Sequence, residues 1–181
     1  LQKEGIECVK FNPIYPIFSA IYNNRDHRKI VVIDGKIGYT GGANVGDEYA
    51  NEVKRFGYWK DAVIKVEGEG VNELTRLFIA SFDGITKRQS DYAKYFPQNV
   101  EKYENGEYVH FFGDGPKPYD NENIGENNFV NIITSAKKYV YITTPYLIIS
   151  HNLFTALKNA SSRGVDVRIV TPSIPDKKII F

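Results

Sequence analysis

Five residues near the start of the chain combine side chains and a spacing that suit phosphate chemistry. His27 and Lys29 stand two positions apart, and on an extended strand such positions project from the same face. A neutral imidazole can attack phosphorus as a nucleophile, and an adjacent ammonium stabilises charge on the non-bridging oxygens. Gly41 and Gly42 permit close approach of the backbone, and the Asn44 amide can donate to phosphate oxygens. The pattern predicts a phosphate site that requires no metal.

Asp34 is the sixth member of this pattern and has two interpretations. The spacing His-x-Lys-x4-Asp-x6-Gly-Gly-x-Asn includes it, which makes it a candidate catalytic residue. Asp34-Gly35 is also the dipeptide that a type I′ hairpin turn favours, whatever the chemistry nearby. A turn or salt-bridge role is the favoured interpretation of the two. Strands expected over residues 27–33 and 36–40 would then form the hairpin that carries His27 and Lys29.

The rest of the pattern predicts a mixed α/β fold. A first domain is expected over residues 1–83 and a second over residues 107–181, with a linker or covering segment over residues 84–106. In the first, alternation predicts further strands at 5–11 and 59–66, and helical spacing of apolar residues predicts a helix over 71–82. In the second, we expect parallel strands at 108–112, 139–143 and 165–170, with helices from about 125–138 and 152–162.

The composition is that of a globular chain. Of the 181 residues 42% are hydrophobic and 25% are charged, and the formal net charge is +1. A charge this close to zero argues against a nucleic-acid partner. The single cysteine, Cys8, is expected to be a small buried side chain, and no stretch approaches the roughly 20 apolar residues that would span a bilayer. Because the chain contains no methionine, we expect it to be a piece of a longer protein.

The residues around His27 and Lys29 resemble the first signature motif of the phospholipase D superfamily, and within it they are most similar to bacterial cardiolipin synthases. The similarity continues through residues 24–35, 40–49, 58–61, 67–68, 113–116, 144–146 and 163–168. It implies a phospholipase D-like mixed β-sheet flanked by helices, with two related halves, truncated here at both ends. It also implies transfer of a phosphatidyl group between two phosphatidylglycerol molecules through a phosphohistidine, which gives cardiolipin and glycerol.

The resemblance assigns roles to residues of this chain. His27 would be the nucleophile or its partner acid, and Lys29, Asn44 and Gly42 would hold the phosphoryl oxygens. Asp61 is the candidate for a carboxylate that fixes the tautomer of the ring, with an ordinary strand-edge aspartate as the alternative. No cofactor or metal is implied. Phosphatidylglycerol and a membrane surface are the expected partners, and the full-length protein is expected at the cell membrane.

Members of this family carry two such motifs, so that one histidine attacks while the other protonates the leaving group. Neither His110 nor His151 is followed two residues later by lysine, so both are expected to be structural. The second motif is expected beyond Phe181, and the chain alone is expected to have little or no transferase activity. Two alternatives stay open: a phosphodiesterase or nuclease of the same superfamily, and a module that binds anionic lipid or phosphate without turnover.

Overall fold

The computed structural model describes residues 1–12, 26–54, 57–97, 104, 106–114 and 122–173. The chain divides into two compact units, residues 1–112 and residues 113–181. The first unit contains every predicted site residue: His27, Lys29, Asp34, Gly42, Asn44 and Asp61. The candidate site is therefore built within one unit.

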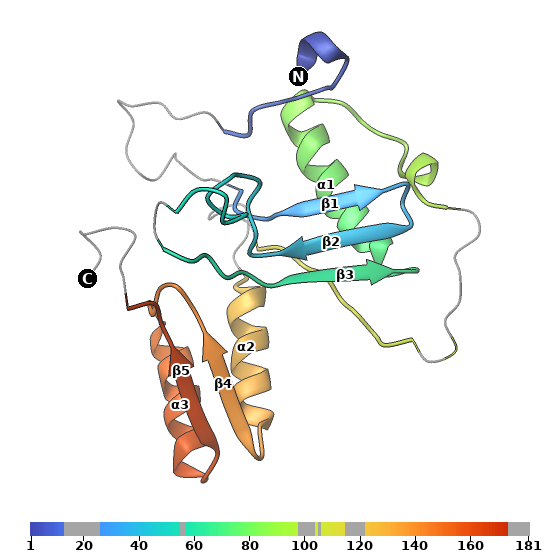
Figure 1. The fold of residues 1–181 in the computed structure, drawn as a ribbon. Coiled ribbons are helices and arrows are strands. Elements are labelled where there is room, and N and C mark those ends of the chain that lie inside the picture. The colour runs from blue at the N-terminus through green and yellow to red at the C-terminus, as the bar shows by residue number, and fades with distance from the viewer. Residues whose placement is uncertain (13–25, 55–56, 98–103, 105, 115–121, 174–181) are drawn as a thin grey trace. The chain divides into compact units, whose positions relative to one another are not determined.

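A three-stranded antiparallel sheet forms the centre of the first unit (Figure 1). Its strands, β1 (Ile30–Ile33), β2 (Ile37–Gly41) and β3 (Val63–Glu67), pair in chain order. The predicted turn joins the first two strands, with φ angles of 54° at Asp34 and 67° at Gly35. Positive φ at both central positions matches the twist of the flanking strands. The hairpin prediction is thus confirmed.

One helix, α1 (Val71–Thr86), packs on one face of this sheet (Figure 1). Val71 and Leu74 on the helix are almost fully buried, with 0% and 1% of their surface exposed. They lie against Gly38 of β2, where a β-carbon would be only 2.7 Å from Leu74 Cδ1. The missing side chain at Gly38 lets the helix approach the strand closely. This packing fixes which face of the sheet is covered.

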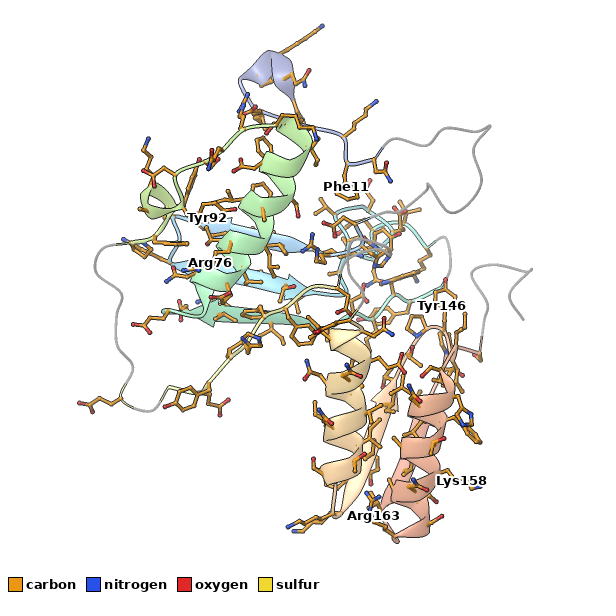
Figure 2. All side chains as sticks on the ribbon, turned by 180° about the vertical axis from the view of Figure 1, so that it is seen from behind. Phe11, Arg76, Tyr92, Tyr146, Lys158 and Arg163 are labelled. Carbon is orange, nitrogen blue, oxygen red and sulfur yellow. The ribbon has the colours of Figure 1, made fainter. Side chains whose placement is uncertain are left out.

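The segment after α1 folds back against the helix. Ser90 donates through its amide and its hydroxyl to the two carboxylate oxygens of Asp83, each at 2.7 Å. The short helix η3 (Tyr92–Tyr95) follows. The Arg76 guanidinium lies over the Phe96 ring, 5.0 Å from its centroid, on the same side of α1 as the labelled Tyr92 (Figure 2). This segment therefore belongs to the packing of the first unit.

The second unit consists of α2 (Ile124–Ser135), β4 (Tyr139–Thr143), α3 (His151–Ser162) and β5 (Asp166–Val170). β4 and β5 pair in parallel, as predicted. A small apolar core consists of Ile133, Ala156, Leu157, Ala160 and Val165, and partly buried side chains of both strands pack against it. Arg163, at the end of α3 (Figure 2), donates to a carbonyl of α2 at 2.9 Å and so fastens the two helices together.

Two of the predicted strands are wrong. Residues 5–11 and 108–112 pair with no other strand in the described part of the chain. Alternation alone does not make a strand, because the backbone groups also need a partner strand. In the first segment the Cys8 carbonyl instead accepts a hydrogen bond from the Gln2 side chain at 3.0 Å, and Cys8 is only half-buried. None of the described helices is long and apolar enough to cross a bilayer.

Candidate phosphate site

His27 and Lys29 lie on the segment that leads into β1, and their side chains meet. The strand begins at Ile30, three residues later than predicted. The Lys29 ammonium lies 2.9 Å from His27 Nδ1, 3.3 Å from Nε2 and 2.7 Å from the His27 carbonyl oxygen. An ammonium can only donate, so the ring nitrogen that accepts from it offers a lone pair. His27 is exposed and Lys29 is half-buried, so both groups can reach a ligand at the surface.

Arg28, between these two residues, points to the other side of the chain. Its guanidinium pairs with Asp26, Nε to Oδ1 at 2.8 Å, and donates to Ser81 of α1 at 2.8 Å. The hydrogen bond between them lowers the pKa of Asp26 and raises the pKa of Arg28. Because Arg28 faces α1, alternation directs His27 and Lys29 toward the opposite face. The motif spacing does not include this anchor, although Arg28 lies one position from both His27 and Lys29 and so projects from the opposite face.

The glycine pair lies where β2 ends and β3 begins. Gly41 pairs with Val63, and the Gly42 amide donates to the Ala62 carbonyl at 3.0 Å. A β-carbon at Gly41 would overlap that carbonyl oxygen, and one at Gly42 would lie 2.7 Å from Asp61 Oδ1. β1 also begins at this end of the antiparallel sheet. One end of the sheet therefore carries four of the predicted residues: His27, Lys29, Gly42 and Asp61.

The Asp61 carboxylate is held by a tryptophan. Trp59 Nε1 donates to Asp61 Oδ2 at 2.6 Å. Among the residues that the structure describes, no carboxylate pairs with the His27 ring, so the expected contact between Asp61 and the ring is not made here. The indole binds one oxygen of this carboxylate, and the other, Oδ1, lies against Gly42. Within the same residues, no three side chains gather that could hold a metal ion.

Asn44 and Asp34 differ in their distance from this end of the sheet. Asn44 is half-buried in the loop directly after Gly42. Asp34 is separated from Lys29 by five residues of extended chain, which is about 16 Å at roughly 3.3 Å per residue. It is exposed in the hairpin turn and lines a cavity of about 670 Å³ beside α1. The structure thus gives Asp34 the position of a turn residue, away from the His27 and Lys29 side chains.

Known proteins resemble this chain along its whole length. Residues 129–180 match a family model described as the cardiolipin synthase, PLD-like domain. All 181 residues align at 36% identity with a cardiolipin synthase of Geobacillus sp. (strain WCH70). A cardiolipin synthase of Halalkalibacterium halodurans is 37% identical over 182 aligned positions. The chain is thus similar to phospholipase D-like proteins, cardiolipin synthases among them. The mixed α/β architecture of both units agrees with this similarity.

The same comparisons show how much of a relative this chain represents. It spans 36% of the length of each of the two cardiolipin synthases. An uncharacterized protein of Streptococcus mutans serotype c is 46% identical over the whole chain, which spans 39% of it. The family model covers part of the second unit, whereas the candidate site lies in the first unit. The segment with His27 and Lys29 lies outside the family model, but it is included in the alignments that cover all 181 residues of this chain.

Proposed function

We propose that the protein containing this chain is a phosphatidyltransferase that makes cardiolipin from two phosphatidylglycerol molecules at a membrane surface. The observation that carries the proposal is the contact between the Lys29 ammonium and the His27 ring at 2.9 Å. It brings a nucleophile and a fixed positive charge to one exposed position, as transfer at phosphorus requires. Similarity to cardiolipin synthases supports the phospholipid substrate class.

In the proposed reaction a His27 ring nitrogen attacks the phosphorus of phosphatidylglycerol. The bond to the glycerol oxygen breaks, and glycerol leaves after that oxygen takes up a proton. A hydroxyl of a second phosphatidylglycerol then loses its proton, attacks the phosphohistidine and releases the ring with formation of cardiolipin. The Lys29 ammonium would turn from the ring to the non-bridging oxygens, whose negative charge grows in both transition states.

Gly42, Asn44 and Asp61 have distinct parts in this proposal. The Gly42 amide is already bonded to Ala62, so Gly42 would contribute close approach of the backbone rather than a donor. The Asn44 amide would supply a neutral donor to a phosphoryl oxygen. Asp61 Oδ2 is bonded to Trp59, which leaves Oδ1 as the oxygen that would face the ring during the reaction. The proton for the leaving glycerol would come from a second motif outside this chain.

The proposal is tested by substituting the nucleophile in the full-length protein. With vesicles of phosphatidylglycerol, His27→Ala should lower cardiolipin formation by at least about 10³-fold, as loss of a covalent nucleophile does. His151→Ala is the matched control, because His151 is an exposed residue at the start of α3 and should leave the rate unchanged. The 181-residue chain alone should form little or no product.

Each other result has a definite meaning. Full activity of a folded His27→Ala variant would remove His27 from the mechanism. Release of phosphatidic acid in place of cardiolipin would favour the phosphodiesterase alternative. Binding to anionic vesicles with no product from the full-length protein would favour a binding module.

A further inference from the structure

Trp59 is held firmly by the loop that follows the glycine pair. The Asn51 side chain bonds to both sides of the Trp59 backbone: its amide donates to the carbonyl at 2.9 Å, and its oxygen accepts from the Trp59 amide at 2.6 Å. The indole packs edge-on against Tyr49, with ring centroids 4.8 Å apart and an interplanar angle of 88°. Asn51 takes a positive φ of 63° to do this, a conformation that asparagine tolerates. Backbone and ring are thus both fixed.

This fixed indole binds one oxygen of Asp61. Trp59 Nε1 donates to Oδ2 at 2.6 Å, and hydrogen bonds to an ionised acceptor are the stronger class. The second oxygen, Oδ1, lies against Gly42, so closely that a β-carbon there would be 2.7 Å away. The Asp61 side chain is exposed, and without the indole it would exchange among rotamers. Its orientation therefore depends on this one donor.

We infer that Trp59 is a positioning residue that holds the Asp61 carboxylate with Oδ1 turned toward Gly42 and the candidate phosphate site. The catalytic consequence rests on the proposed function, in which Asp61 acts on the His27 ring. The indole is neutral and can only donate, so it orients the carboxylate without neutralising it. Loss of the indole N–H should slow the chemical step and leave substrate binding nearly unchanged.

The bond can be observed directly because Trp59 is the only tryptophan of the chain. A ¹H–¹⁵N spectrum of the 181-residue chain therefore contains a single indole signal. A strong bond to a carboxylate should place its proton clearly downfield, and Asp61→Asn should move it upfield. Asp47→Asn is the matched control, since Asp47 is an exposed acid in the same loop region, and should leave the signal in place. An indole proton whose chemical shift is the same in Asp61→Asn as in the wild type would overturn the inference.

The catalytic part is tested in the full-length protein with Trp59→Phe, which keeps a ring against Tyr49 but removes the donor. The rate of cardiolipin formation should fall by about ten- to hundredfold, the range of a hydrogen bond to a charged group, with KM changed less than about twofold. Adding Trp59→Phe to Asp61→Asn should cause no further loss, because the two residues act as a unit. A full rate for a folded Trp59→Phe variant, or a strictly additive double variant, would refute the positioning role.

Failure of the proposed function would give a different result. In that case His27→Ala would stay active, whereas the indole signal would still respond to Asp61→Asn. If Trp59→Phe fails to fold, the spectrum of the wild-type chain and Asp61→Asn still decides whether the bond exists.

Discussion

The two adjacent glycines of the site should respond differently to the same substitution. At Gly41 a β-carbon would overlap the Ala62 carbonyl oxygen and lie 2.8 Å from Val63 Cα, which are backbone atoms at the start of β3 and directly before it. Backbone atoms cannot move aside without breaking the pairing of β2 with β3. Gly41→Ala should therefore destabilise the first unit by about 1–3 kcal/mol, the usual cost of overpacking.

At Gly42 the obstacle is the tip of a flexible side chain. The three nearest atoms to a β-carbon there all belong to Asp61, with Oδ1 at 2.7 Å and Cγ at 3.3 Å. Turning this side chain away costs about 0.5–1.5 kcal/mol, and replacing glycine restores about 0.4–1 kcal/mol by restricting the unfolded chain. The net change in stability for Gly42→Ala should thus lie close to zero, while the Asp61 carboxylate is displaced from its position.

Urea unfolding followed by the fluorescence of Trp59 separates the two variants. With a denaturant slope of about 2 kcal/mol per M, Gly41→Ala should lower the midpoint by about 0.5–1.5 M, and Gly42→Ala should leave it nearly unchanged. The indole N–H signal should nevertheless shift in Gly42→Ala, because its acceptor has moved. Equal destabilisation by both substitutions, or a Gly42→Ala variant with an unaltered indole signal, would refute the geometry on which this reasoning rests.

Two further predictions concern stability. The hydrogen bond from Arg28 lowers the pKa of Asp26. This partly exposed ion pair should contribute less than about 1 kcal/mol to the free energy of unfolding. The contribution is fully present above about pH 4, the pKa of an unfolded aspartate, and is lost as the pH falls through the lower pKa of Asp26 in the folded state. In the Arg28→Ala variant the unfolding midpoint should therefore fall less steeply with decreasing pH below about pH 4 than in the wild type. Equal pH dependence of the two midpoints would contradict this. In the second unit, the Ser150 hydroxyl accepts from the Leu153 amide at 3.2 Å and donates to Glu126 at 2.8 Å. Ser150→Ala should cost about 0.5–2 kcal/mol, measured by circular dichroism at 222 nm, and no loss would show that the cap is dispensable.

The sequence alone determined the elements whose signals are local. Asp34-Gly35 specifies a turn with two positive φ angles because the residue types themselves favour that conformation. Apolar residues at helical spacing likewise located α1, which extends to Thr86, four residues past its predicted end. The proximity of His27 and Lys29 also follows from their spacing, since positions two apart project together from any extended chain. Each of these conclusions needs only neighbouring residues.

The tertiary structure decided everything that depends on distant partners. Residues 5–11 alternate like a strand, yet no described backbone pairs with them, and pairing is not encoded in the alternation itself. Spacing could not show that Asp61 meets Gly42, where a β-carbon would lie only 2.7 Å from Asp61 Oδ1. Nor could it show that the Arg28 guanidinium donates to Ser81 of α1. Which groups meet at a site is set by how strands and loops pack, because contacts between residues far apart in the chain arise only when the whole unit folds.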